Sequence, residues 1–233
     1  MQSRNGKSPR IIVKVGTSTL TRGGKKLCMP QMVELVRQLA ELQDAGYQIT
    51  LVTSGGISAG REAMENPDVP AFLPEKQMLA AIGQPRLMAI YTQLFGLYEK
   101  QIAQVLLTRE DLADRQRYLN ARNTLEALLR FNVIPIINEN DTVATEEIQL
   151  GDNDNLSALV ANVLEADLLI LLTDQEGVFT ADPCKDDSAE LVSQVNTTEL
   201  PASIVAGAGE TANGLGTGGM STKVKAADLA RRR

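Results

Sequence analysis

The sequence predicts an α/β fold in which helices cover both faces of a mostly parallel β-sheet. Short β-branched runs alternate with segments of helical periodicity along the 233 residues, which is typical of βαβ units. Hydrophobic residues make up 43% of the chain and charged residues 22%, so a single sizeable core can form. The longest apolar run is far shorter than the ~20 residues that a membrane helix needs, so we expect no membrane partner.

Hydrophobic periodicity and turn residues locate each element. In chain order, we expect strands at 10–15, 48–53, 102–107, 133–137, 168–172 and 178–180, and helices at 30–45, from 57, at 75–100, at 118–130, at 156–164 and from 221. The first strand is a β-branched run that follows a loose tail (1–9), and Pro30 and Gly46 bound the first helix. The helix at 75–100 is expected to break near Gly83–Pro85, because proline removes a helical hydrogen bond.

Parallel sheets bind ligands outside the carboxyl ends of their strands. Four segments follow predicted strands and are therefore the places where a site is expected: 14–18, 53–56, 138–141 and 173–177.

The composition excludes several classes of function. The chain contains no histidine, so catalysis by a histidine base and metal binding by histidine are both excluded. The net charge is −6, whereas a nucleic-acid-binding protein usually has a basic excess, so we expect no nucleic-acid partner. The two cysteines, Cys28 and Cys184, provide no disulfide framework, which indicates a reducing cytoplasm.

Two glycine motifs match catalytic patterns without the required context. Residues 56–60 (GISAG) fit a nucleophile elbow, but a serine nucleophile there needs a histidine base. We interpret these small residues as packing a helix close to the sheet. Residues 214–219 (GLGTGG) fit a dinucleotide-binding fingerprint, but no strand precedes them, so we reject a dehydrogenase.

Two lysines are candidates for binding an anion. Lys14 lies near the end of an apolar strand. Its ammonium group either reaches the surface or points into the ligand crevice outside the carboxyl ends of the strands. Lys223 follows a glycine turn at a helix start, which is either a capped surface loop or an anion site. Lysines on both sides of a phosphoryl group can neutralise the charge that develops during its transfer.

Three polar residues near these lysines are further candidates. Asp154 is either a helix N-cap or the group that pairs with and orients both lysines. Asn153 and Asp141 can hydrogen-bond the ammonium or carboxylate groups of a small polar substrate.

Seven segments in combination resemble the amino acid kinase family: VKVGTSTL, LVTSGGISAGR, LLTREDLADRQRYLNARNTLEALL, VIPIINENDTVAT, GDNDNLSALVA, LLLTDQEGVFTADP and GLGTGGMSTKVKAADLA. The resemblance covers nearly all of residues 10–230. It implies a three-layer αβα sandwich with an open, mostly parallel sheet over 10–233. It also implies ATP-dependent phosphorylation of the γ-carboxylate of L-glutamate, the first step of proline synthesis. Alternatives are a family activity on N-acetylglutamate or aspartate, or a non-catalytic ligand-binding fragment.

The resemblance also assigns roles to individual residues. Lys14 and Lys223 correspond to lysines that stabilise the transferring phosphoryl group, and Asp154 to the aspartate that organises them. The glutamate-binding positions are Ser54, Asp141 and Asn153. The nucleotide-binding positions are Lys14, Thr173, Asp174, Thr217, Gly218, Gly219, Met220, Ser221, Thr222 and Lys223. Magnesium is expected to be carried mainly by the ATP phosphates, without a protein metal site. Family members are cytoplasmic, commonly homo-oligomeric and often inhibited by proline.

The sequence departs from the family pattern in two places. Gly56 stands where members commonly have alanine. The family's kinase domain continues beyond the final helix into further strands, and many members add a PUA domain. We therefore expect a chain that is truncated at its C-terminus, lacks those strands and a PUA domain, and is less stable and weaker in ATP binding than an extended version.

Overall fold

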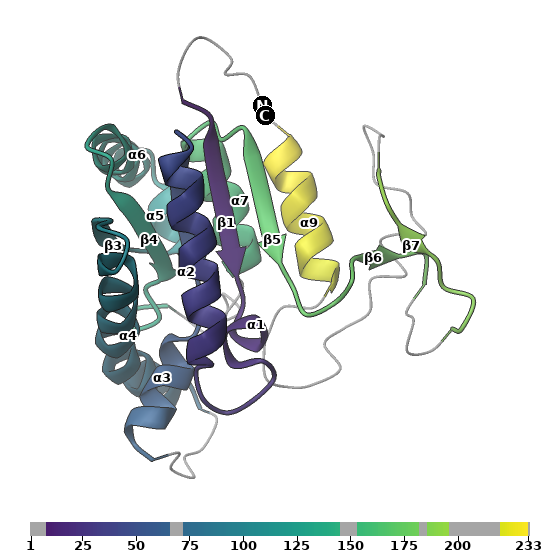
Figure 1. Ribbon diagram of the computed structural model, residues 1–233, viewed down its shortest axis with the longest axis horizontal. Helices are drawn as coiled ribbons and strands as arrows, with labels where there is room; N and C mark the ends of the chain where they lie inside the picture. The colour runs from purple at the N-terminus through teal and green to yellow at the C-terminus, as the bar shows by residue number, and fades with distance from the viewer. Residues whose placement is uncertain (1–7, 66–71, 145–152, 182–185, 196–219, 233) are drawn as a thin grey trace.

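Five parallel strands form the central sheet of the computed structural model, which describes residues 8–65, 72–144, 153–181, 186–195 and 220–232. Their order is β3-β4-β2-β1-β5 (Figure 1). Their bounds are β1 (Arg10–Val15), β2 (Gln48–Thr53), β3 (Ile102–Leu107), β4 (Ile134–Glu139) and β5 (Leu168–Leu172). The predicted α/β fold with a parallel sheet is confirmed.

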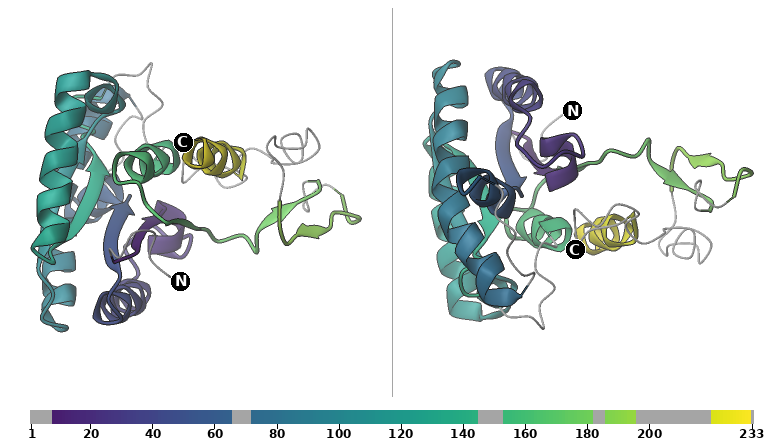
Figure 2. Two further views of the ribbon diagram at one scale, coloured as in Figure 1. Left: turned by 90° about the horizontal axis from the view of Figure 1, so that it is seen from above. Right: turned by 90° about the horizontal axis from the view of Figure 1, so that it is seen from below.

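Helices lie on both faces of this sheet (Figures 1 and 2). One layer contains α1 (Thr17–Thr21), α2 (Met29–Asp44), α3 (Gly56–Ala63) and α4 (Leu73–Gly96), and the other contains α5 (Arg109–Ala113), α6 (Arg115–Arg130), α7 (Asn153–Val163) and α9 (Met220–Arg231). Alternate residues of β1 face the two layers, so that Ile11 and Val13 pack with α2 and Ile12 packs with α7. A separate antiparallel pair, β6 (Val178–Phe179) and β7 (Leu191–Val192), projects beyond α9 (Figure 1).

Helix α4 is unbroken, so the predicted break near Gly83–Pro85 is wrong. Pro85 removes one backbone hydrogen bond, yet it lies on the exposed side of a helix whose other side is firmly packed. Gly83 is buried, and a Cβ there would collide with the backbone of Gly56 and Gly60 in α3. The main packing partner of residues 56–60 is therefore helix α4 and not the sheet, although Gly56 also lies close to Asn138 of β4, which corrects our interpretation of that motif.

Short elements and element ends account for the other differences. Helices α1 and α5 and strand β7 were not expected. The start of α5 has a sequence signal, because Thr108 and Asp111 form a capping box there. Helix α7 begins at Asn153 rather than at residue 156, because Asn153 and Asp154 already belong to its first turn. Strand β4 continues to Glu139, which places Asn138 within the sheet.

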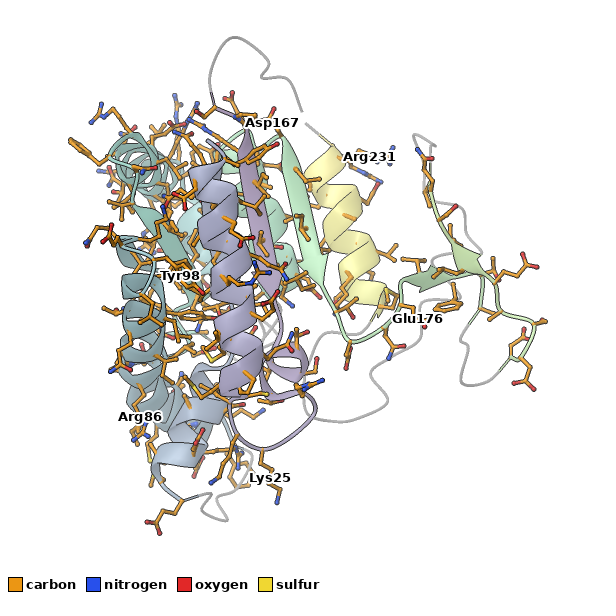
Figure 3. The ribbon with its side chains drawn as sticks, viewed as in Figure 1. Lys25, Arg86, Tyr98, Asp167, Glu176 and Arg231 are labelled. Atoms are coloured by element: carbon orange, nitrogen blue, oxygen red, sulfur yellow. The ribbon has the colours of Figure 1, made fainter. Side chains whose placement is uncertain are left out.

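The amino ends of the strands are joined by Arg10. Its backbone N–H donates to Asp167 Oδ2 over 2.8 Å, and its guanidinium donates to both carboxylate oxygens of Glu126 and to the carbonyl of Leu164. In Figure 3, Asp167 marks the amino end of the sheet, and the labelled Lys25 lies at the other end of the molecule. This network links β1, α6 and the turn before β5, and it leaves the carboxyl end of the sheet for ligands. Among the described helices, none is both long and apolar enough to span a membrane.

We predict that Gly83→Ala destabilises the chain, because the added methyl group has no space between α4 and α3. Overpacking of this kind typically costs about 1–3 kcal/mol. The matched control is Gly96→Ala at the end of the same helix, where a Cβ meets no atom within 4 Å. Urea unfolding of the two variants measures the difference, and equal midpoints would show that α3 and α4 can move apart freely.

Candidate active site

The sheet has a topological switch point between β2 and β4. These neighbouring strands run parallel, but β2 leads into α3 on one face and β4 is followed by α7 on the other. Such a switch opens a crevice outside the carboxyl ends of the two strands. The start of α7 lies at this crevice and brings Asn153 and Asp154 to it.

Three charged side chains meet beside the crevice. The Lys14 ammonium lies 2.6 Å from Asp154 Oδ1, and the Lys223 ammonium lies 3.4 Å from Asp154 Oδ2. The Lys14 side chain is on the same face of β1 as Ile12, two residues earlier, and therefore points toward α7. A Cβ at Gly16 would lie 3.3 Å from Lys14 Nζ, so a glycine at that position leaves room for the ammonium group.

Asp154 keeps its negative charge despite its burial. Only 1% of its side chain is exposed. Burial raises the pKa of Asp154, but the charges of Lys14 and Lys223 and the hydrogen bonds from Lys14 and Thr222 outweigh this effect, so its pKa lies below the ordinary value. Thr222 Oγ1 donates to Asp154 Oδ2 over 2.7 Å. Of the two interpretations of Asp154, the structure shows the one in which it pairs with both lysines.

A cluster of amide groups lies on the other side of Asp154. Asn153 Nδ2 donates to the carbonyl of Thr53 (2.8 Å), to Ser54 Oγ (2.9 Å) and to Asn138 Oδ1 (3.0 Å). Its own Oδ1 is buried and accepts no hydrogen bond within the described residues. A buried acceptor of this kind is costly unless a donor reaches it, so Asn153 offers an acceptor for a ligand N–H.

Asp141 follows β4 in a turn and lies on the crevice side of the sheet. Burial raises the pKa of Asp141 to about 6. The carboxyl group is therefore charged at neutral pH and becomes protonated under mildly acidic conditions. No hydrogen bond within the described residues joins Asp141 to Ser54 or Asn153, whereas Ser54 and Asn153 are bonded to each other.

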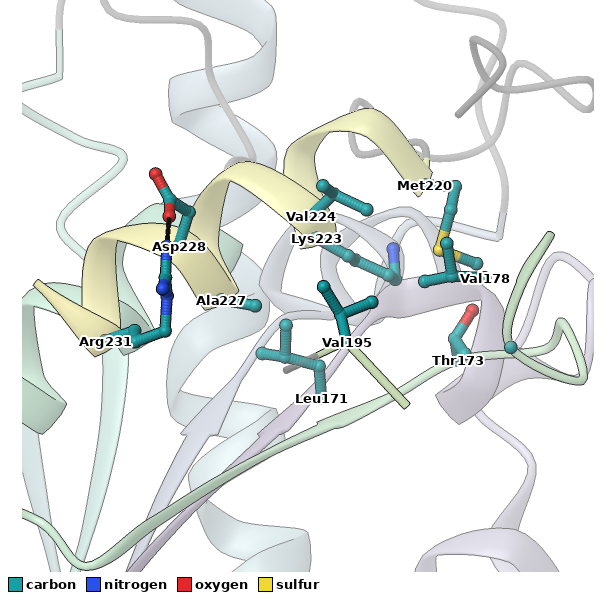
Figure 4. A pocket seen from close by; sticks show the side chains of 11 residues that line it. Leu171, Thr173, Val178, Val195, Met220, Lys223, Val224, Ala227, Asp228 and Arg231 are labelled. Atoms are coloured by element: carbon teal, nitrogen blue, oxygen red, sulfur yellow. Dashed lines mark hydrogen bonds and ion pairs between the residues drawn. The ribbon is translucent and has the colours of Figure 1, made fainter. Parts of the chain in front are cut away.

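A cavity of about 300 Å³ lies between the end of β5 and α9 (Figure 4). Its lining is mostly apolar and includes Leu171, Thr173, Val178, Met220, Lys223 and Val224. Lys223 borders this cavity and also contacts Asp154, so it connects the cavity with the charged cluster. The volume lies at the lower end of the range for small-molecule sites.

The structure brings most of the predicted residues to one end of the sheet. Lys14, Asp154, Thr222 and Lys223 are in contact, and Ser54 and Asn153 form the neighbouring pair. Thr173 and Met220 line the cavity, Asp174 is exposed beside Thr173, and Ser221 is in the first turn of α9. Thr217, Gly218 and Gly219 lie outside the described residues.

Two amide residues in this region were not singled out from the sequence, although one of them, Asn138, lies in the segment 138–141 where a site was expected. Asn138 donates from Nδ2 to Gln84 Oε1 over 2.8 Å and accepts from Asn153. Asn138 could have been found, because it interrupts an apolar strand near its carboxyl end. Gln84 carried no such signal, since its place beside the site depends on how α4 packs. In the described part of the chain, no group of three or more metal-binding side chains is present.

Comparisons with known proteins give consistent matches. The model of the amino acid kinase family matches residues 9–233. The chain is 55% identical to the glutamate 5-kinase of Aliivibrio fischeri and 56% identical to that of Shewanella oneidensis, over 98% and 96% of its length. The glutamate 5-kinase of Shigella flexneri is 54% identical over 96% of the chain. The chain spans 61%, 59% and 60% of the lengths of these relatives.

We predict that Asp154→Asn lowers the free energy of unfolding by about 3–5 kcal/mol at pH 7, because the buried Lys14 and the partly buried Lys223 lose their carboxylate. The control is Asp44→Asn, in which an exposed carboxylate paired with Lys100 is lost, at a cost within about 0.5 kcal/mol.

The loss of unfolding free energy in Asp154→Asn should depend on pH. The folded-state pKa of Asp154 is lowered, so its stabilising contribution is fully present above about pH 4 and is lost as the pH falls further. Urea unfolding between pH 3 and pH 7 measures this dependence. A deficit that is independent of pH would contradict the ion-pair explanation.

Proposed function

Because this chain belongs to the amino acid kinase family, we propose that it transfers the γ-phosphoryl group of ATP to the γ-carboxylate of L-glutamate. The products are L-glutamyl 5-phosphate and ADP. The observation that carries the proposal is the buried contact of one carboxylate, Asp154, with the two lysines Lys14 and Lys223. The names of the relatives, glutamate 5-kinases at 54–56% identity, support the choice of substrate.

The reaction needs little covalent chemistry from the protein. A γ-carboxylate oxygen of glutamate attacks the γ-phosphorus, the new O–P bond forms as the bond to the bridging oxygen breaks, and ADP leaves. Catalysis of this step is mostly positioning and electrostatic stabilisation. Lys14 and Lys223 supply positive charge on both sides of the transferring group, and Asp154 fixes their spacing. Magnesium would be carried by the ATP phosphates and reduce their charge.

The acceptor side of the site is the end of β2 together with the start of α7. We assign Ser54 and Asn153 to the substrate's polar groups, since they already form one hydrogen-bonded unit at the crevice. Asn153 Oδ1, which accepts no hydrogen bond from the described residues, suits the substrate ammonium. Asp141 supplies the negative charge that an ammonium group requires at neutral pH.

The donor side is the cavity beside α9. Its apolar lining suits a nucleotide base, and Lys223 at its border suits the phosphates. The first turn of α9, with Met220, Ser221 and Thr222, offers backbone N–H groups and the positive end of a helix dipole. We assign the nucleotide to this turn, to Thr173 and Asp174, and to the preceding segment Thr217–Gly219.

A substrate panel distinguishes the proposed activity from the alternatives. ATP-dependent turnover is measured with L-glutamate, N-acetyl-L-glutamate and L-aspartate, and we expect L-glutamate to be preferred. An N-acetyl group is uncharged and gains nothing from Asp141, so a preference for it would overturn our substrate assignment. Calorimetric binding of glutamate and ATP without turnover would indicate a non-catalytic ligand-binding protein.

The same proposal has consequences for the cell. L-glutamyl 5-phosphate formation is the first step of proline synthesis, so proline is our candidate feedback inhibitor. We further propose a cytoplasmic location and a homo-oligomeric state, as the family resemblance implies.

We predict that Lys14→Ala and Lys223→Ala each lower turnover by about 10²–10³-fold, because each removes charge that acts on the transition state. Glutamate binding should change much less. The matched control is Lys225→Ala, which removes an exposed lysine two residues further along α9. Steady-state kinetics with calorimetry separate the two effects, and a lysine variant that retains more than half of its turnover would refute the assignment.

We predict that Asp141→Asn raises the KM for glutamate and leaves the KM for ATP nearly unchanged, since a carboxylate that faces an ammonium acts on ground-state binding. In the parent chain, the KM for glutamate should rise as the pH falls through about 6, because Asp141 becomes protonated there. The Asn variant should lose this pH dependence. A changed KM for ATP alone would mean that the two subsites are exchanged.

A further inference from the structure

We propose that helix α4 positions the acceptor side of the site through two buried side chains, Gln84 and Tyr91, neither of which touches substrate. This inference rests on the proposed function. Both residues lie on the buried side of α4, seven residues apart and therefore on one face of the helix. Each begins a chain of hydrogen bonds that ends at Ser54 or Asn153.

The first chain consists of amide groups. Gln84 Oε1 accepts from Asn138 Nδ2 over 2.8 Å, and Asn138 Oδ1 accepts from Asn153 Nδ2 over 3.0 Å. Asn138 Oδ1 also accepts from the backbone N–H of Glu139 over 2.9 Å, which fixes the plane of its amide group. Gln84 therefore holds the Nδ2 end of the Asn138 amide, and Asn138 Oδ1 in turn holds the amide of Asn153, whose own Oδ1 accepts no hydrogen bond within the described residues.

The second chain consists of hydroxyl groups. Tyr91 is completely buried, and its hydroxyl lies 2.8 Å from Thr53 Oγ1. Thr53 Oγ1 donates to the carbonyl of Ser54 over 3.0 Å, so Tyr91 is the donor in its contact with Thr53. Tyr91 thus orients the Thr53 hydroxyl, and that hydroxyl binds the Ser54 carbonyl. Asn153 binds the carbonyl of Thr53 and the hydroxyl of Ser54 from the crevice side.

The two chains meet because the strand ends are aligned. Val52 pairs with Ile137, so Thr53 and Asn138 follow side by side at the carboxyl ends of β2 and β4. The region is also tightly packed, since a Cβ at Gly56 would lie 3.3 Å from Gln84 Oε1 and 3.5 Å from Asn138 Nδ2. Little space is left for water to replace a lost amide partner, so the loss of Gln84 should reach Asn153.

The experiment compares four variants with the parent chain. Gln84→Met keeps the shape of the side chain but removes the amide acceptor. Gln84→Glu keeps an oxygen that accepts from Asn138 Nδ2 in either protonation state. Tyr91→Phe removes the hydroxyl. Leu87→Met is the matched control, because Leu87 is completely buried on the same side of α4 and carries no polar group.

Glutamate and ATP binding are measured separately by calorimetry. We expect Gln84→Met to weaken glutamate binding about tenfold and to change ATP binding less than about twofold, because leaving a buried amide unpaired is costly. Gln84→Glu should recover most of the affinity, Tyr91→Phe should weaken glutamate binding about threefold, and Leu87→Met should resemble the parent. Equal losses for glutamate and ATP, or equal losses in Gln84→Met and Gln84→Glu, would overturn the proposal.

A second measurement without ligand separates this inference from the proposed function. The side-chain amide protons of Asn138 and Asn153 are followed by NMR hydrogen exchange, which we expect to become about tenfold faster in Gln84→Met and unchanged in Leu87→Met. Unchanged exchange in Gln84→Met overturns the positioning role. If exchange responds to Gln84→Met as expected but the parent protein binds no glutamate, the proposed function is overturned instead. The role of Gln84 in ordering Asn138 and Asn153 would then still hold.

Discussion

The buried carboxylate of Asp154 lies between two ammonium groups at the carboxyl end of the sheet, and the surrounding elements hold it there. Charges removed from water destabilise a fold unless partners are held in place. Asp154 is on α7, and its partners come from β1 and α9. Lys14 precedes Asp154 by 140 residues, and Lys223 follows it by 69. The parallel sheet brings these segments together, because the carboxyl ends of all five strands lie at the same end of the sheet.

The same carboxylate divides the site into two sides. Toward β2 and β4, Asn153 holds the ends of the strands in a network of amide and hydroxyl groups. Toward β5, Lys223 borders an apolar cavity beneath α9. In the proposed reaction, a phosphoryl donor and an anionic acceptor approach the two lysines from opposite sides. Close packing of α3 on α4 at Gly60 and Gly83 supports the acceptor side, because it holds α4 near the strand ends.

Much of this arrangement was predictable from the sequence. The alternation of apolar strands with helical periodicity indicated the parallel sheet, and the rule that ligands bind at carboxyl strand ends selected segments that contain Lys14, Ser54 and Thr173. Two predictions were wrong for the same reason, because packing between elements decides features that the local sequence does not show. Pro85 was expected to break α4, but packing on one face stabilises a helix more than one missing hydrogen bond weakens it. Residues 56–60 were assigned to packing on the sheet, although their partner is another helix.

By itself, the sequence determined the fold class, the absence of histidine chemistry and the family resemblance that marked Lys14, Asp154 and Lys223, because strand periodicity and residue type are local properties. Only the tertiary structure decided that Asp154 pairs with both lysines rather than capping its helix. It also decided that Gln84 and Tyr91 of α4 connect to Asn153 and Ser54. The role of a buried polar side chain cannot be inferred from the sequence until its hydrogen-bond partner is known. That partner depends on which helix packs against which strand end.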